Sequence, residues 1–419
     1  MTMTVHRARP THFRWLVLLL PLLLTAACIP QDLAVSPLGT VVVGPGEAIQ
    51  IRSAEVLTGI GELGIPRQRA VAMALADYGP IKGHAVSMGA GLDSLCTAQG
   101  GLGAAQTVVG DPRVVGLIGT SCSVAAAVAS PILSEAGLVM ISSSNTSPSL
   151  TSDLRGNAGS NYYAGYYRTA SNDLHLGRAV AEFAYTELGL RRMATIHDGD
   201  PYTSGLTGAF AVEFEALGGA VTAVAEAGRG ETDMLPALTH IAAGSPEGLF
   251  FLLFPDESAR VARQIGQVDG LEEVTLISSD SLLLAAPEIV DVYLTGPELG
   301  FGNNINQATG KSGDEVLAAY EERYGEGPTS AYLAHAYDAA TLLLHAIGAV
   351  AVVHGDALYI DRAKLRQALT NTTGFEGVIG VISCDGFGDC GTGRAEIRHH
   401  TDPTVTEFAD LPVVYRYSR

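Results

Sequence analysis

Short apolar runs alternate with longer amphipathic segments along most of the chain. Runs without a polar face are typical of strands buried in a parallel sheet. The predicted strands cover residues 48–51, 84–88, 114–118, 138–141, 192–197, 220–225, 248–254 and 274–278. The predicted helices cover residues 66–78, 97–109, 123–136, 173–188, 203–217, 232–243 and 256–268. This alternation predicts an α/β fold with parallel sheets and helices on both faces.

The number of predicted strands favours two Rossmann-like lobes, because at least eight strands are too many for one small sheet. A chain of 419 residues is also too long for one ordinary core. The alternation breaks at 162–169, 295–297 and 375–380. Three crossings at these breaks would form a three-strand hinge beside a cleft that can close around a ligand.

These breaks predict the division of the chain into lobes. The expected first lobe contains residues 47–166 and 296–374, and the expected second lobe contains residues 167–295 and 375–419. Within the first lobe, residues 313–370 are expected to be helical. Thr40–Val43 is expected to form a short strand that packs on the body.

Two neighbouring predicted strands are each followed by a loop rich in hydroxyl groups. Residues 119–123 follow the first strand, and residues 142–147 follow the second. Ligands of parallel α/β sheets bind at the carboxyl ends of the strands. Free N–H groups at a helix N-terminus also attract negative charge. The loops therefore predict a docking site for a small anionic or zwitterionic group, and the alternative is that the hydroxyls are ordinary helix caps.

The first 27 residues have the pattern of a secretory signal peptide. A basic head with three Arg precedes an apolar run at 15–24, which is too short to predict a membrane span. Small residues then precede Cys28, an order that resembles a bacterial lipoprotein signal, although Thr25 stands where Leu is usual. We therefore expect lipidation of Cys28, which attaches the protein to the membrane through a tether at 28–46. The alternative is a soluble secreted protein cleaved nearby.

The charge of the chain argues against nucleic acid as a partner. The formal net charge is −19, and removal of the leader with its three Arg and no acid makes it −22. A chain with this charge would be repelled by nucleic acid and by anionic lipid surfaces.

The cysteine count agrees with export. Four of the five cysteines remain if Cys28 carries lipid, and an even number suits an oxidising compartment. Three pairings are possible, and we favour Cys96–Cys122 with Cys384–Cys390. The alternative is that all four are buried free thiols. A zinc site is disfavoured because the sequence has no CxxC pair or Cys/His cluster.

Sequence signatures of catalysis are incomplete in this chain. Residues 309–312 look like the end of a phosphate-binding loop, but Ile305 stands where that loop needs Gly. Residues 119–123 resemble a nucleophile elbow without its closing Gly. The eleven His show no metal-ligand spacing. We therefore expect no enzyme activity, no cofactor and no metal, and a catalytic triad assembled only in space is the alternative.

A set of short motifs is spread over nearly the whole mature chain. The motifs are Ile81-Lys82-Gly83-His84, the Cys96 loop with Gly100-Gly101, Asp111-Pro112, residues 118–123, Ala129-Ser130-Pro131-Ile132, Glu135-Ala136-Gly137, Met140-Ile141-Ser142, Pro148-Ser149-Leu150-Thr151, Asp200-Pro201-Tyr202, Ser278-Ser279-Asp280, Ala336-Tyr337-Asp338-Ala339 and Phe375-Glu376-Gly377. Together they resemble the periplasmic substrate-binding proteins of branched-chain amino-acid ABC transporters. The resemblance implies the two-lobed type I periplasmic binding fold, with an ABC transporter permease as partner, and we expect a monomer.

The resemblance also implies which residues bind the ligand carboxylate. In this family one lobe holds that group with backbone N–H and hydroxyl groups, a role that falls here on Ser123, Ser144 and Thr146. The family disulfide would join Cys122 to Cys96 and hold the loop that offers Ser123.

The second lobe of the family supplies an acid for the ligand ammonium and aromatic residues for its side chain. Asp280 stands at the position of the acid, which is often Glu, and its alternative is an N-cap. Tyr202 matches one aromatic residue, and its alternative is a packed surface residue. Phe254 stands where Tyr is common and makes the pocket wall more apolar.

These expectations combine into one functional prediction. The chain is predicted to be a lipid-anchored extracytoplasmic binding protein that captures a small amino acid, branched-chain or otherwise apolar, for an ABC importer. The alternatives are a ligand-sensing module for a separate receptor and a binder of a related amide, urea or carboxylate ligand.

Overall fold

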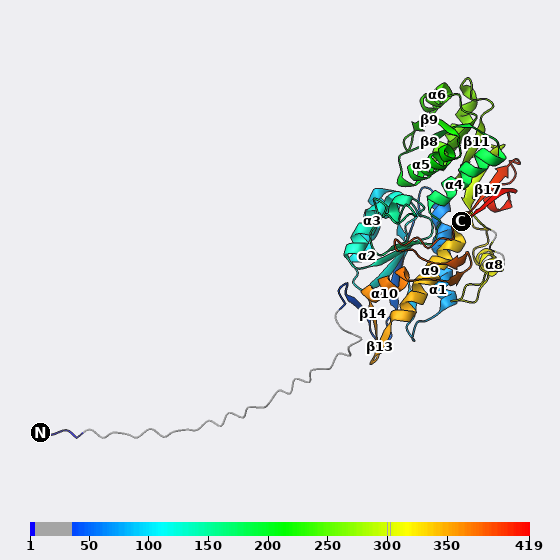
Figure 1. Ribbon diagram of the computed structural model, residues 1–419. Coiled ribbons are helices and arrows are strands. Elements are labelled where there is room, and N and C mark those ends of the chain that lie inside the picture. The colour runs from blue at the N-terminus through cyan, green and yellow to red at the C-terminus, as the bar shows by residue number, and fades with distance from the viewer. Residues whose placement is uncertain (5–35, 300, 302) are drawn as a thin grey trace. The chain divides into compact units, whose positions relative to one another are not determined.

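Two sheets organise the body of the chain, one in each lobe, and helices cover both faces of each sheet (Figure 1). The structure is a computed structural model that describes residues 1–4, 36–299, 301 and 303–419. Residues 5–27 of the predicted signal peptide, Cys28 and the first part of the predicted tether lie outside the described residues. The α/β class with two lobes built on parallel sheets is confirmed.

The sheet of the first lobe is entirely parallel. In spatial order its strands are β3 (Val86–Ser87), β2 (Ile49–Glu55), β5 (Val114–Gly119), β6 (Val139–Ser142) and β7 (Tyr166–Arg168), and β4 (Leu92–Asp93) also pairs with β2. The helices on one face are α1 (Gly61–Tyr78), α9 (Leu333–Val350) and α10 (Arg362–Thr370). The helices on the other face are α2 (Ala98–Val109) and α3 (Ser123–Glu135). Every residue of β5 is buried, as the absence of a polar face predicts.

Small residues set the close contact between α2 and α3. A Cβ on Gly101 of α2 would lie 2.3 Å from the carbonyl oxygen of Ala125 in α3, which no side chain could tolerate. The Thr97 hydroxyl caps α2 by accepting the Gly100 N–H at 3.1 Å. Gly101 therefore allows α2 and α3 to pack closely, and Thr97 stabilises the start of α2.

The sheet of the second lobe has a parallel core and an antiparallel edge. In spatial order its strands are β18 (Val413–Ser418), β17 (Arg394–His400), β12 (Val292–Pro297), β11 (Thr275–Ser279), β10 (Gly248–Phe251), β8 (Arg192–His197) and β9 (Ala220–Glu226). One face is covered by α4 (Asp173–Glu182) and α5 (Pro201–Ala216). The other face is covered by α6 (Leu235–Ala243) and α7 (Pro255–Gln264).

The prediction that 313–370 is helical throughout is wrong. The segment contains α8 (Gly313–Tyr324), α9, the hairpin of β13 (Val352–His354) and β14 (Ala357–Asp361), and α10. Gly325 ends α8 at φ 75°, and Gly355 turns the hairpin at φ 61°, conformations that favour glycine. The predicted strand Thr40–Val43 is confirmed as β1, which pairs antiparallel with β14.

The third crossing between the lobes lies later than the sequence predicts. The hairpin of β15 (Phe375–Gly377) and β16 (Gly380–Ile382) packs its apolar side chains in the core of the first lobe. Asp338 of α9 holds it by accepting the Val378 and Ile379 N–H groups at 3.0 and 2.9 Å. The expected second-lobe range 375–419 therefore includes a segment that packs with the first lobe, and the second lobe resumes at β17.

Helix α9 is long and apolar enough, by composition alone, to cross a membrane. Fourteen of its 18 residues are buried inside the first lobe, so it is explained as a core helix.

Candidate functional site

One cavity of about 80 Å³ lies between the lobes, next to the carboxyl ends of both sheets. This volume is far below the roughly 300–1,000 Å³ typical of pockets for drug-sized ligands, and it suits a small molecule. The cavity brings together all six residues predicted to bind ligand, namely Ser123, Ser144, Thr146, Tyr202, Phe254 and Asp280. A larger groove of about 1,190 Å³ between α4, α5 and β18 contains none of the six.

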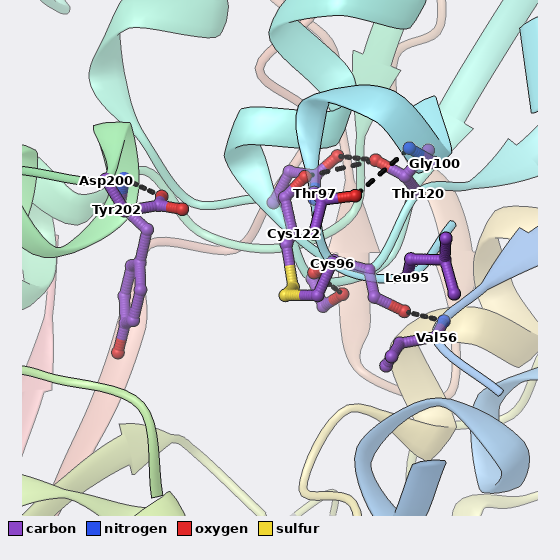
Figure 2. Close-up of a disulfide and its surroundings, with 12 residues drawn as sticks. Val56, Leu95, Cys96, Thr97, Gly100, Thr120, Cys122, Asp200 and Tyr202 are labelled. Atoms are coloured by element: carbon purple, nitrogen blue, oxygen red, sulfur yellow. Dashed lines mark hydrogen bonds between the residues drawn. A yellow bond between two sulfur atoms is a disulfide. The ribbon is translucent and has the colours of Figure 1, made fainter. Parts of the chain in front are cut away.

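The loop between β5 and α3 carries Ser123, which is the first residue of the helix. Its side chain is 1% exposed, and its Oγ accepts the Ser147 N–H at 3.4 Å. The predicted disulfide between Cys96 and Cys122 is present, with 5.1 Å between the two Cα atoms. Figure 2 shows this disulfide across an open space from Tyr202. The disulfide ties the Ser123 loop to the loop that precedes α2.

The loop after β6 is held in shape by its own hydroxyl groups. Ser142 Oγ accepts the N–H groups of Ser144 and Asn145 at 3.2 and 3.0 Å. The Ser144 hydroxyl donates to the Ser121 carbonyl at 3.0 Å and so joins the two loops. Thr146 Oγ1 is buried without a hydrogen-bond partner among the residues described. Ser144 therefore positions the loop, and the Thr146 hydroxyl lines the cavity beside the Asp173 carboxylate without a hydrogen bond of good geometry among the described residues.

A buried ion pair supports this loop from below. Arg168 donates from Nε to Asp389 Oδ1 at 2.5 Å and from Nη1 to the carbonyls of Asn145 and Ser147 at 3.2 and 2.7 Å. Asp389 lies in the small loop closed by the second predicted disulfide, Cys384–Cys390, which is also present. The second disulfide thus holds the acid that orients Arg168 under the Thr146 loop, a role that the sequence did not reveal.

Asp173 lies beside Thr146 at the start of α4. Its carboxylate is fully buried, and neither oxygen makes a hydrogen bond with good geometry to the described residues. Burial raises the pKa of Asp173 to about 7, and the nearby Thr146 hydroxyl and Arg168 guanidinium oppose this effect. This acid therefore changes its protonation state near neutral pH.

The second lobe contributes Asp280, which follows β11 and is partly exposed to the cavity. Ser279 is the N-cap of the short helix Asp280–Leu284, so Asp280 does not have the capping role that was its alternative. Burial raises the pKa of Asp280 to about 6, whereas the Ser281 N–H and the Arg67 charge lower it. A cation beside this carboxylate would therefore stabilise its charged form.

Tyr202 and Phe254 form aromatic walls from the second lobe. Tyr202 is the second residue of α5, where Asp200 caps the helix by accepting the Tyr202 N–H at 2.9 Å. Burial raises the pKa of the Tyr202 hydroxyl, so this group stays neutral. Tyr202 therefore belongs to the cavity rather than to the outer surface.

Arg229 covers Phe254 and also reaches the first lobe. Its guanidinium lies 3.3 Å from the centre of the Phe254 ring. It lies 3.6 Å from Asp198 Oδ2 and donates to the Cys96 carbonyl at 3.2 Å. Because Phe254 belongs to the second lobe and Cys96 to the first, Arg229 joins the two lobes beside the cavity.

Arg67 is a cavity residue that the sequence interpretation missed. It lies on α1, is 4% exposed, and places Nε 3.2 Å from Glu55 Oε2. The available signal was its position four residues before Val71, which puts a cation in the apolar stripe of this helix. Helix α1 also begins at Gly61, earlier than predicted, which brings Leu63 into the cavity wall.

A family model described as periplasmic binding protein matches residues 57–395, which is most of the chain. The chain belongs to the periplasmic binding protein family. This membership makes it a non-catalytic binding protein and places it outside the cytoplasm. Within the part of the chain that the structure describes, no group of three or more His, Cys, Asp or Glu side chains could hold a metal ion.

Known proteins similar to this periplasmic binding protein include amino-acid binders. An amino acid binding protein from Pseudomonas aeruginosa is 27% identical over 173 residues, 41% of this chain and 44% of that protein. The match therefore spans less than half of that relative. A second P. aeruginosa protein, named for binding leucine, isoleucine, valine, threonine and alanine, is 25% identical over 329 residues, 75% of this chain and 79% of that protein.

A solved structure agrees with the fold. A leucine-binding protein from Thermotoga maritima superposes with a TM-score of 0.73 and 22% identity, covering 88% of this chain and 99% of that protein. At this identity the likeness shows the shared two-lobed architecture alone.

Proposed function

We propose that this periplasmic binding protein captures a small amino acid between its lobes and delivers it to an ABC importer. The observation that carries the proposal is one small cavity in which hydroxyls of the first lobe face a carboxylate of the second lobe. Such a site is complementary to a zwitterion. The two Pseudomonas aeruginosa relatives, both named as amino-acid binders, support the same ligand class.

The first lobe is proposed to hold the ligand carboxylate. Ser123 and Thr146 offer hydroxyl donors, and Ser123 is also the first residue of α3, where N–H groups and the helix dipole favour negative charge. Ser144 lines the same cavity and positions the loop through the Ser121 carbonyl.

The second lobe is proposed to hold the ligand ammonium through Asp280, with Tyr202 and Phe254 around the rest of the ligand. A charge-assisted hydrogen bond in a closed, dry site is stronger than one between neutral groups. A ligand that touches both lobes favours the closed form by the difference in its affinity for the closed and open forms.

The cellular location of the protein is also part of the proposal. The leader and Cys28 support secretion followed by a lipid anchor, which would keep the monomeric binding protein near its membrane permease. Labelling of the expressed protein with a fatty-acid probe tests the anchor, and Cys28→Ser is expected to abolish the label. Equal labelling of both proteins would remove the anchor from the proposal.

A thermal-shift screen of the protein without its leader tests the binding function. A ligand that binds only the folded state at 100 times its Kd adds about 2.7 kcal/mol to the free energy of unfolding. We expect one or more small amino acids to raise Tm, and we expect the same compounds to raise Tm of Asp280→Ala much less. If no amino acid, amide or carboxylate raises Tm, the proposal is refuted.

A further inference from the structure

Arg67 is a buried cation in the cavity wall that the capture of a zwitterion does not use. It lies on α1, whereas the hydroxyls proposed for the ligand carboxylate lie at the start of α3 and after β6. Burial of a charged side chain is costly unless the structure pairs it. Its presence in a cavity of this size therefore calls for an explanation.

A network behind the cavity fixes the position of Arg67. Glu55, at the end of β2, is fully buried and holds Arg67 Nε at 3.2 Å. The Ser121 hydroxyl donates to the same Glu55 oxygen at 2.6 Å, and the Val56 N–H donates to Ser121 Oγ at 2.7 Å. The guanidinium thus has one preferred orientation, and Glu55 acts on the ligand only through Arg67.

The terminal nitrogens of Arg67 are the donors left over. A guanidinium has five N–H donors. Arg67 Nε lies 3.2 Å from Glu55 Oε2 in an ion pair, but it makes no hydrogen bond of good geometry among the described residues. None of the hydrogen bonds found among the described residues starts from Nη1 or Nη2, and Arg67 lines the cavity. Donors left unsatisfied in a closed site carry a penalty that an oxygen acceptor on the ligand would remove.

The charges around the cavity decide which acceptor fits. Glu55 neutralises Arg67, and Asp280 adds one negative charge that the ligand ammonium would neutralise. With these two pairs neutral, the α-carboxylate of the ligand gives the closed site a net charge of about −1. A second ligand carboxylate would add another in a medium of low dielectric constant, whereas a hydroxyl or carboxamide oxygen accepts from Arg67 without adding charge.

We propose that Arg67 is a specificity residue that donates to a neutral oxygen on the side chain of the bound amino acid. The preferred ligands are then amino acids with a hydroxyl or carboxamide side chain rather than branched aliphatic ones. This inference rests on the proposed function and changes one expectation, because Tyr202 and Phe254 alone indicated an apolar side chain.

Isosteric ligand pairs test the inference by isothermal titration. Threonine and valine have the same shape, and asparagine and leucine differ little in size, so each pair isolates the side-chain oxygen. The wild-type protein is expected to bind threonine and asparagine at least about tenfold more tightly than valine and leucine. Arg67→Met is expected to bring each ratio close to one. Aspartate is expected to bind more weakly than asparagine.

A second variant protects the test against misfolding. Arg67→Met leaves the Glu55 charge buried without its partner, so the double variant Glu55→Gln/Arg67→Met removes both charges together. Thermal unfolding identifies which variant is folded, and the ratios are measured on that one. Unchanged ratios in a folded variant would overturn the inference.

The results for the wild-type protein separate the two proposals. Tightest binding of valine or leucine would overturn the role of Arg67 and leave amino-acid capture intact. Tighter binding of aspartate than asparagine would overturn the neutral acceptor. A protein that binds none of the five amino acids but responds to another one in the thermal-shift screen would overturn this inference alone. A protein that responds to no amino acid, amide or carboxylate would overturn the proposed function together with this inference.

Discussion

Replacement of Asp280 tests the acid proposed for the ligand ammonium. Asp280→Ala removes this carboxylate from a cavity that also contains Tyr202, Phe254 and the buried Arg67. Removing one partner of a desolvated, hydrogen-bonded charge pair costs about 2–5 kcal/mol of binding free energy. Much of this cost arises because the other charge stays buried without a partner. At 1.4 kcal/mol per factor of ten, the affinity should fall by roughly 30- to several thousand-fold. Because the carboxylate lies in a cavity rather than in the core, Tm of the empty protein should change little.

The assay is isothermal titration with whichever amino acid gives the largest thermal shift. Asp256→Ala is the matched control, because it removes an exposed carboxylate from the same lobe at the start of α7. The control should bind with wild-type affinity. An affinity for Asp280→Ala within threefold of the wild-type value would remove Asp280 from the site.

The pH dependence of binding is a second test of whether Asp280 pairs with the ligand ammonium. Burial raises the pKa of Asp280 to about 6, and only the charged form pairs with an ammonium group. The affinity should therefore fall by about tenfold per unit as pH drops below 6. Asp280→Asn should bind weakly at every pH and lose this dependence. A wild-type affinity that stays constant between pH 5 and pH 8 would contradict the assignment.

Three further predictions concern the residues around the cavity. Asp173→Asn should raise the free energy of unfolding at pH 8 and change it little at pH 4. The wild-type protein loses stability as pH rises through the raised Asp173 pKa of about 7, whereas Asn does not ionise. Equal effects at both pH values in denaturant unfolding would contradict this prediction. Arg229→Met should speed ligand dissociation with little change in association, since its contact with Cys96 joins the lobes, and stopped-flow traces with unchanged dissociation would exclude this role. Thr146→Val should lower affinity by about tenfold or more at unchanged Tm, and full affinity in titration would show that the hydroxyl is not used.

The first-lobe half of the site could be predicted from the sequence because its geometry is local. Ser123 and Thr146 follow neighbouring parallel strands, and the carboxyl ends of such strands meet at one edge. The second-lobe half could not be derived this way. Tyr202, Phe254 and Asp280 lie on a different sheet, so only the family resemblance connected them with the hydroxyls before the structure was known.

What the sequence did not reveal depends on contacts between distant segments. Arg67 enters the cavity because Glu55 of β2 holds it, a partner that the spacing of residues on α1 does not reveal. Asp389 orients Arg168 from 221 positions away along the chain. The hairpin of β15 and β16 returns to the first lobe because Asp338 binds its backbone N–H groups. In each case a polar partner on another element decides the local structure.

A crystal structure with the bound amino acid would examine both halves of the proposed site at once. Electron density for one amino acid is expected in the cavity between the lobes. The ligand carboxylate should lie within hydrogen-bond distance of the Ser123 and Thr146 hydroxyls, and the ammonium should lie against Asp280. A ligand in the groove between α4, α5 and β18, or one without contact to Asp280 and the hydroxyls, would contradict the proposed site.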